Sequence, residues 1–162
     1  MPTVANPFAA TDADRRAIWD ILMLRDLTAF IANDWKQTAG DFVPNKEFVG
    51  IDAGKQADPA QWKLTYPSLA IYREEWLRQA AAFSKTELVG TDKATFLFGA
   101  ITLARIDITG ARALADKVFA GSAKAADGSA VELRWRTLYH LRRSSDGWKI
   151  AGFIGYLPEP AR

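Results

Sequence analysis

The sequence predicts an α+β domain in which helices come first and a sheet of antiparallel strands follows. Apolar residues recur at helical spacing through the first half of the chain, whereas from residue 101 onward they alternate or run together, as in strands. Three turn signals, "GAR", "ADGS" and "SSDG", separate those later stretches. The chain has 162 residues, of which 49% are hydrophobic and 25% charged, which is typical of one folded domain. Because helices and strands are segregated along the chain, the class is α+β.

The first predicted helix covers residues 11–32. Thr11 is the expected N-cap, and Asp12 places negative charge in the first turn, where it suits the helix dipole. Asn33 is expected to end the helix, because asparagine tolerates the left-handed conformation of a C-terminal cap. A short second helix is expected over residues 34–42.

The middle of the chain alternates between short elements and loops. Residues 47–54 are rich in β-formers and predict a short strand, and residues 55–64 read as a loop. Pro67 suits the first turn of a third helix over residues 68–83. Residues 85–100 predict an irregular link with a short helix around "KATFLFG".

Four strands are expected after the helices, and together they make an antiparallel meander. We expect a single domain over residues 11–158, with a flexible arm at residues 1–10 before it and a short tail at residues 159–162 after it. The expected strands cover residues 101–109, 113–125, 130–143 and 148–157.

The composition excludes several classes of function. Lys and Arg exceed Asp and Glu by only 21 to 19, a formal charge of +2, so we expect no nucleic-acid partner. Cysteine is absent, histidine occurs once and glycine-rich phosphate loops are lacking, so we expect no metal and no cofactor. No apolar run approaches the roughly 20 residues that a bilayer requires, and the first residues lack a signal-peptide pattern. A cytoplasmic protein without membrane contact is expected.

Two passages carry a resemblance to a known family. The first, "FIANDWKQTAGDFVPNKEFVGID" (residues 30–52), is similar to a succession of helix, "GD" pair, short helix and strand in that family. The second, "LRWRTLYHLRRSSDGWKIAGFIGYL" (residues 133–157), resembles its final hairpin with a "DG-W-K-I" turn. Over residues 11–158 the chain thereby resembles the nuclear transport factor 2-like superfamily, and within it the SnoaL-like branch of polyketide cyclases and ketosteroid-isomerase-like proteins.

The resemblance implies a cone-shaped fold, also described as a cystatin-like roll, in which a curved antiparallel sheet wraps around three helices of the N-terminal half. It implies an apolar pocket at the open end of the cone. It also implies a homodimer, because sheets in this superfamily often pack against a second subunit through their outer face. Members include isomerases, dehydratases, epoxide hydrolases and polyketide cyclases, and also noncatalytic transport and assembly domains. The fold therefore says little about the reaction.

Asp26 is the first candidate site residue, because it interrupts the apolar stretch "WDILMLRDLTAF" (residues 19–30). On a wheel of about 100° per residue it falls among Trp19, Met23 and Phe30, which indicates that it points inward. A buried carboxylate needs partners, so two interpretations stay open: a hydrogen bond that ties helix to sheet, or an acid or base in the pocket.

Asp52 is the second candidate, at the end of the strand predicted over residues 47–54. The resemblance implies a general base there, since a catalytic aspartate occupies a similar place in ketosteroid-isomerase-like members. The alternative is a loop aspartate that caps the turn at Ala53 and Gly54. The same isomerases have an acidic phenol on the first helix, where this chain has Asp26, and this difference argues for another pairing of groups.

The third of the four strands has two faces of different character. Trp135 and Tyr139 share the apolar face, which is expected to line the core or the pocket. His140, the only histidine, belongs to the opposite, charged face, so it is expected to lie outside the pocket rather than to act as a base. That charged face, with Arg134 and Arg136, is expected to meet solvent or a second subunit.

Aromatic side chains are expected to line the rest of the pocket. Tyr72 and Trp76 face inward from the third helix, Tyr66 lies just before it, and Tyr156 shares the inward parity of Ile154 in the last strand. Such walls suit a small apolar or aromatic molecule held by a few polar groups. The expected ligand contacts are Trp19, Met23, Phe30, Tyr66, Trp76, Trp135 and Tyr156.

Two functions from different classes stay open on the sequence alone. In the first, a cofactor-free isomerase, cyclase, dehydratase or hydrolase uses Asp26 and Asp52 to move protons, with Tyr72 or Tyr139 donating a hydrogen bond to a developing oxyanion. In the second, the domain binds a small molecule or assembles as a dimer without catalysis. Two polar groups that converge on an open cavity favour the enzyme, whereas an Asp26 held by structural hydrogen bonds favours the binding module.

Overall fold

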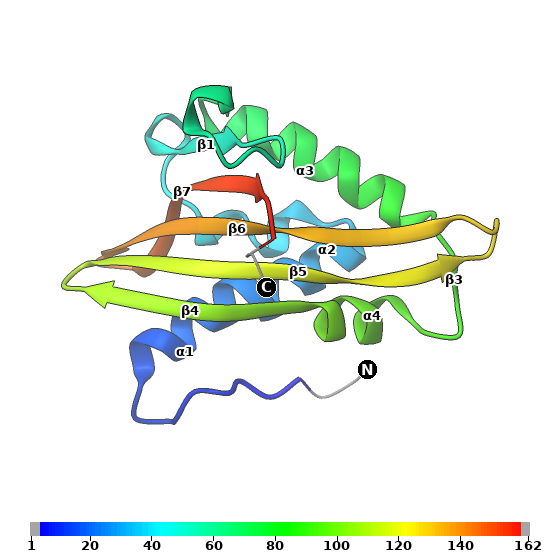
Figure 1. Cartoon of the computed structure of the whole chain (residues 1–162). Helices are drawn as coiled ribbons and strands as arrows, with labels where there is room; N and C mark the ends of the chain where they lie inside the picture. Colours follow the sequence, from blue (N-terminus) through cyan, green and yellow to red (C-terminus); the bar gives the residue numbers. More distant parts are fainter. Residues whose placement is uncertain (1–3, 160–162) are drawn as a thin grey trace.

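A computed structural model of the chain describes residues 4–159 (Figure 1). Its first helix is continuous, but in the middle its hydrogen bonds widen to the spacing of a π-helix. This confirms the long first helix that the sequence predicts. The three segments are α1 (Ala13–Trp19), the π-helical turn (Asp20–Arg25) and α2 (Asp26–Ala32).

The two ends of this helix show which residues stop it. At the start, the Asp12 carboxylate accepts the Arg15 N–H, so Asp12 is the cap and the prediction of Thr11 is wrong. An aspartate at this position satisfies a free N–H and adds negative charge at the positive end of the helix dipole. At the other end, Asn33 adopts a left-handed conformation with φ of 51°, which confirms its predicted role.

The chain turns twice between the first helix and the first strand. The single short helix predicted over residues 34–42 is wrong, because two 3-10 turns, Trp35–Gln37 and Ala39–Asp41, stand in its place. The break lets the rings of Trp35 and Phe42 stack in the core with centroids 5.1 Å apart. A continuous α-helix would hold residues seven apart at a distance of about 10 Å along its axis, so the buried stacking favours the broken form.

The remaining elements follow in the predicted order, with additions in two segments. Residues 55–64, predicted as a loop, contain a 3-10 turn and enter a short strand, and residues 85–100 contain a two-residue strand as well as the predicted helix. Ser68 caps the third helix, since its hydroxyl accepts the Ile71 N–H, and Pro67 lies before the cap. The elements are β1 (Val49–Asp52), β2 (Lys63–Tyr66), α3 (Leu69–Ser84), β3 (Leu88–Val89), α4 (Lys93–Ala100), β4 (Ile101–Thr109), β5 (Arg112–Ala125), β6 (Ala130–Ser144) and β7 (Gly147–Leu157).

One sheet contains all of these strands, in the order β2-β1-β7-β6-β5-β3, with β4 also paired to β5. The strands from β4 to β7 form the predicted antiparallel meander. The prediction of a wholly antiparallel sheet is wrong at one place, because β1 runs parallel to β7, with Val49 opposite Gly152. β1 reaches the sheet from the helical half of the chain and not through a hairpin, so no tight turn imposes an antiparallel pairing.

The sheet is open and curved, and the helices fill its hollow side. In Figure 1 the long strands β5 and β6 cross the front of the molecule, with α2 behind them and α3 across the upper part. Register shifts interrupt the pairing of β4 with β5 and, at two places, that of β6 with β7, and such bulges bend a sheet. The α+β class and the curved sheet around the helices of the N-terminal half are therefore confirmed.

The segment over residues 4–10, part of the predicted flexible arm, lies along the first helix. The Asn6 amide donates to the Arg16 carbonyl and to the Asp20 carboxylate. Phe8 packs against both clusters of buried core residues. The rest of the predicted arm and tail, residues 1–3 and 160–162, lies outside the described residues.

Candidate functional site

A cavity of about 210 Å³ lies between the helices and the hollow face of the sheet. Its walls come mainly from α2, α3, β6 and β7, with contributions from α4, β4 and β5. Most of the lining side chains are apolar or aromatic and only a few are polar, which is the usual composition of a small-molecule site. The carboxylate, hydroxyl and amide groups in the lining belong to Asp26, Tyr72, Gln79, Thr137, Tyr139 and Tyr156.

Asp26 faces this cavity from the first turn of α2, as the helical wheel predicts. Both oxygens of its carboxylate have partners: Oδ1 accepts from Trp76 Nε1 at 3.3 Å, and Oδ2 accepts from Lys117 Nζ at 2.8 Å. The Asp26 side chain is 19% exposed, whereas the Lys117 side chain is 1% exposed. The first interpretation left open by the sequence, a hydrogen bond that ties helix to sheet, is therefore what the structure has. Asp26 also borders the cavity, and a role there as an acid or base stays a prediction.

Lys117 is a site residue that sequence reasoning missed. It lies in the middle of β5 and is completely buried, although lysine is among the residues least often buried. Its ammonium group donates to Asp26 and to the Leu22 carbonyl, and it lies 5.4 Å and 5.8 Å from the ring centroids of Phe119 and Tyr139. The counter-charge, the carbonyl and the ring faces together offset the desolvation of the ammonium group.

Strand parity could have pointed to this lysine. Lys117 has the same parity in β5 as Ala113 and Ala115, which are fully buried, so it belongs to the inward face. Parity could not have identified its partner, however. Lys117 and Asp26 are 91 residues apart along the chain, and only the packing of the first helix against the sheet brings them together.

The π-helical turn directly precedes Asp26 and takes part in the same network. The Asp26 N–H donates to the Ile21 carbonyl, five residues earlier, as a π-helix requires. The Leu22 carbonyl, which accepts from Lys117, lies in the same turn. Single π-helical turns occur frequently at functional sites, and no sequence pattern predicted this one.

Tyr72 of α3 and Tyr139 of β6 both line the cavity. Within residues 4–159, neither hydroxyl has a hydrogen-bond partner in the protein. Burial is the main cause that raises the pKa of both phenols well above the usual value, and neighbouring acidic groups, Asp26 among them, raise it further. Both phenols are therefore protonated at neutral pH and free to donate a hydrogen bond to a ligand.

β6 has the two faces that its sequence predicts. Trp135 and Tyr139 line the cavity, while His140 lies on the outer face, in a shallow depression that Leu114 also lines. Burial, and secondarily the positive charge of Arg112, lowers the pKa of His140, so the imidazole is neutral at pH 7. The histidine therefore belongs to the outer surface of the sheet and not to the cavity.

Tyr156 reaches the cavity wall for a reason that strand parity does not capture. A bulge at Ala151 shifts the register of β7 against β6, so Ile154, predicted to face inward, lies on the outer face instead. A second register shift follows between Ile154 and Leu157. There Tyr156 adopts a left-handed backbone conformation, with φ of 57°, and its side chain lines the cavity. Tyr156 therefore lines the cavity, as the sequence predicts, but two register shifts of β7 against β6 bring it there, not regular strand alternation.

Asp52 lies outside the cavity lining. Its Oδ1 accepts the Gly54 N–H at 2.7 Å, which is the turn-capping alternative that the sequence also allowed. This carboxylate is bound to its own turn. The structure therefore does not bring Asp26 and Asp52 together at one cavity, contrary to the prediction from the sequence. The polar groups that do converge with Asp26 are the phenols and the buried lysine.

Three predicted aromatic or sulfur-containing contacts also pack elsewhere. Trp19 and Met23 are buried in the core cluster that forms around α4. Tyr66 is buried in an aromatic cluster, with its ring centroid 5.4 Å from that of Tyr72. The wheel placed the first two residues correctly on an inward face, but a helix buried nearly all round has more than one inward face. Phe30 and Trp76 line the cavity, as predicted.

The described part of the chain offers no separate site for a metal. No group of three or more His, Cys, Asp or Glu side chains within residues 4–159 is arranged to hold a metal ion. The Asp26 carboxylate already has the Lys117 ammonium group as its counter-charge. In the same range, no helix is long and apolar enough to cross a membrane.

Comparison with known proteins reveals the fold. No family model and no curated protein sequence matches the chain, but solved structures do. A Novosphingobium aromaticivorans protein, provisionally named an aromatic ring hydroxylase, is 20% identical, with a TM-score of 0.58 over 91% of this chain and 90% of that chain. A nuclear transport factor 2-like superfamily protein from Salmonella enterica serovar Typhimurium is 18% identical, with a TM-score of 0.57 over 94% and 96% of the two chains. A nuclear transport factor 2-like protein of unknown function from Pseudomonas putida is 16% identical, with a TM-score of 0.57 over 96% and 93%.

These similarities show the fold alone, because the identities are low and proteins with this fold need not share an activity. The chain has the nuclear transport factor 2-like fold, as its sequence predicts. The narrower assignment to the SnoaL-like branch stays a prediction.

Proposed function

We propose that this protein, which has the nuclear transport factor 2-like fold, binds a small, largely apolar molecule in the cavity beside Asp26. The observation that carries the proposal is a cavity of about 210 Å³ with apolar and aromatic walls. Tyr72 and Tyr139 line it, and within residues 4–159 their hydroxyls have no hydrogen-bond partner. A dry cavity of ~150 Å³ accommodates benzene, so this one suits a larger ring system, such as two fused rings.

The charges around the cavity favour an uncharged ligand. The Asp26 carboxylate and the Lys117 ammonium group form an ion pair at 2.8 Å, so together they add no net charge to the cavity. The phenols of Tyr72 and Tyr139 stay protonated because burial raises their pKa. A charged ligand would lose its hydration without gaining a counter-charge, whereas a neutral ligand with an oxygen acceptor gains hydrogen bonds from the phenols.

The state of Asp26 favours binding over proton transfer. Both carboxylate oxygens already accept hydrogen bonds, and the other predicted acid or base, Asp52, is bound to its own turn. Isomerase, cyclase, dehydratase or hydrolase chemistry of the SnoaL-like type stays a prediction, in which Asp26 would act alone with Tyr72 or Tyr139 as hydrogen-bond donor. A cytoplasmic location likewise stays a prediction.

Filling the cavity tests the proposal. The variant Leu133→Trp places a larger side chain at the cavity wall. We expect the affinity for 2-acetylnaphthalene, measured by equilibrium dialysis, to fall at least about 10-fold, because the ligand and the indole compete for the same volume. The control is Leu64→Trp, a position in β2 that is 60% exposed and outside the cavity lining, where no change is expected.

Two results would contradict the proposal. The first is an absence of binding of neutral two-ring compounds to the unaltered protein. The second is equal affinity of Leu133→Trp and Leu64→Trp. Circular dichroism and a thermal unfolding scan of each variant establish that the compared proteins are folded.

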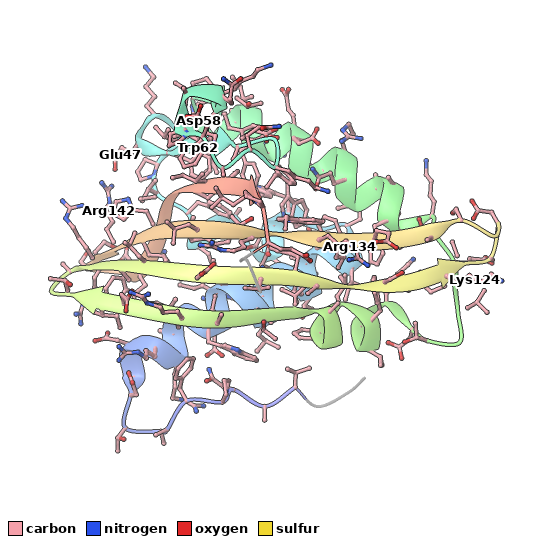
Figure 2. The ribbon with its side chains drawn as sticks, viewed as in Figure 1. Glu47, Asp58, Trp62, Lys124, Arg134 and Arg142 are labelled. Carbon is pink, nitrogen blue, oxygen red and sulfur yellow. The ribbon has the colours of Figure 1, made fainter. Side chains whose placement is uncertain are left out.

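We also propose that the outer face of the sheet joins two copies of the chain. Val49 and Leu114 are 43% and 47% exposed there, around a shallow depression. Charges of both signs border it, since Arg136 pairs with Asp116 at 3.1 Å, and a face with both signs can match a second copy of itself. Figure 2 views this side of the sheet, with Arg134 over β6.

Sedimentation velocity tests the homodimer. We expect the unaltered protein to sediment as a dimer and Leu114→Arg to sediment as a monomer, because the substitution buries an unpaired charge in the interface. The control is Leu64→Arg, which adds the same charge to an exposed position of β2. A monomeric unaltered protein, or a Leu114→Arg dimer as stable as the control, would overturn this part of the proposal.

A further inference from the structure

We infer that Tyr156 is a specificity-determining residue of the cavity, which selects ligands that carry a hydrogen-bond acceptor such as a ketone oxygen. The inference rests on the proposed binding function and names the ligand class. Tyr156 lines the cavity with a backbone φ of 57°, a region that tyrosine rarely adopts.

The backbone around Tyr156 is built to maintain this conformation. The residue lies at the second register shift of β7 against β6, and the extra residue of a bulge re-aims a side chain. The Tyr156 carbonyl accepts the Lys55 N–H at 2.6 Å, and Lys55 itself has φ of 61°. A left-handed tyrosine costs free energy, and the neighbouring bonds that hold it in this conformation point to a role for its side chain.

A chain of hydrogen bonds sets the orientation of the Tyr156 hydroxyl. Gln79 Nε2 donates to Tyr156 Oη at 2.9 Å and to Glu75 Oε1 at 2.8 Å. The two oxygens of Glu75 also accept from Arg78, and its pKa is lowered, chiefly by that hydrogen bond, so the carboxylate is ionised. An ionised carboxylate only accepts, so the Gln79 amide must turn its nitrogen toward Glu75 and therefore toward Tyr156.

The hydroxyl of Tyr156 is consequently an acceptor toward Gln79, and its own proton is not used in that bond. Among the described residues, Tyr156 Oη donates to no protein group. Burial, the largest effect, raises the pKa of this phenol, so it keeps its proton at neutral pH. The proton is available to an acceptor atom of a ligand in the cavity.

The ring of Tyr156 adds a geometric constraint to this donor. It packs against Trp135 with centroids 5.6 Å apart, and both rings line the cavity. Anchored by the bulge at its backbone, by Trp135 at its ring and by Gln79 at its hydroxyl, Tyr156 has little freedom to turn away. A hydroxyl held in this way favours ligands whose acceptor atom lies opposite it. The Tyr156 side chain is already ordered, so it loses little conformational entropy when such a ligand binds.

The test compares two pairs of ligands, each pair of nearly equal shape, on the unaltered protein and on two variants. The acetylnaphthalenes carry a ketone oxygen, and the isopropenylnaphthalenes replace that oxygen by a methylene group. Affinities are measured by equilibrium dialysis for the 1- and 2-substituted isomers of each. We expect Tyr156→Phe to reduce the preference for the better-bound ketone over its hydrocarbon counterpart by about 3- to 10-fold, the effect of one lost hydrogen bond.

Tyr66→Phe is the matched control, because it removes a phenol hydroxyl from the core outside the cavity lining. The ketone preference of this variant is expected to equal that of the unaltered protein. If all four ligands bind but Tyr156→Phe retains the ketone preference, or if the unaltered protein has no such preference, the role of Tyr156 is overturned and the binding function stands. If no ligand binds the unaltered protein, the proposed function itself fails, and the inference with it.

Discussion

Replacing Asp26 by asparagine is expected to lower the free energy of unfolding by about 3 kcal/mol. Asparagine has nearly the same shape but no charge, so the Lys117 ammonium group loses the counter-charge that it has at 2.8 Å. The Lys117 side chain is only 1% exposed, so its ammonium group gains little hydration in place of the lost counter-charge. Urea unfolding followed by circular dichroism measures the change.

Asp41→Asn is the matched control for this prediction. Asp41 also pairs with a cation, but the partner, Arg25, has a side chain that is 45% exposed, so water can solvate the guanidinium group after the substitution. We expect this control to cost about 1 kcal/mol or less. If the two variants Asp26→Asn and Asp41→Asn lose equal free energy of unfolding, the buried ion pair contributes no more to stability than the exposed one.

A double substitution separates charge burial from packing. The double variant Asp26→Leu with Lys117→Met replaces both charges by apolar groups of similar length, and its stability is expected to come within about 1 kcal/mol of that of the unaltered protein. A stable double variant would also provide a cavity without the ion pair, in which the affinity for neutral ketones can be measured. If the double variant were less stable than Asp26→Asn, the loss of stability would come from poorer packing of the new side chains and not from an unpaired charge.

Replacing Gly152 by alanine is expected to lower the free energy of unfolding by about 3 kcal/mol and to separate β1 from β7. A Cβ atom at position 152 would lie 2.2 Å from the Val49 carbonyl oxygen and 3.3 Å from its carbonyl carbon. Both are backbone atoms of the parallel β1–β7 pairing, so the methyl group fits only if β1 moves. Hydrogen exchange of the β1 amides, together with urea unfolding, measures the effect.

Gly99→Ala is the control for this substitution. Position 99 lies in α4, and a Cβ atom there meets nothing within 4 Å. Alanine is a better helix former than glycine, so we expect the control to raise stability by about 0.5–1 kcal/mol. If Gly152→Ala were as stable as the unaltered protein, the close approach of β1 to β7 would not limit which residue fits there.

Sequence reasoning succeeded where a local pattern is also the physical cause of the structure. The two faces of β6 follow from the alternation of side chains in any strand, and this alternation separates Trp135 and Tyr139 from His140. Asn33 ends the first helix because its own conformational preference suits the left-handed cap. The α+β class follows in the same way from periodicity and turn residues.

The same reasoning failed where distant packing overrides the local pattern. A continuous second helix was expected, but the stacking of Trp35 on Phe42 favours two separate turns. The bulge at Ala151 reverses the parity of β7, so a strict alternation places Ile154 on the wrong face. Bulges and broken helices are responses to neighbouring elements, and those neighbours are not visible in a short window of sequence.

The sequence by itself determined the class of the fold, the inward direction of Asp26 and the apolar, aromatic character of the cavity wall, because these depend on periodicity and composition. Only the tertiary structure decided what Asp26 is bound to. Its partner is Lys117, which lies 91 residues away and meets it through the packing of the first helix on β5. Tertiary structure also decided that Asp52 caps a turn and that a bulge turns Tyr156 into the cavity. Pairings between remote residues depend on how whole elements pack, and no local pattern encodes them.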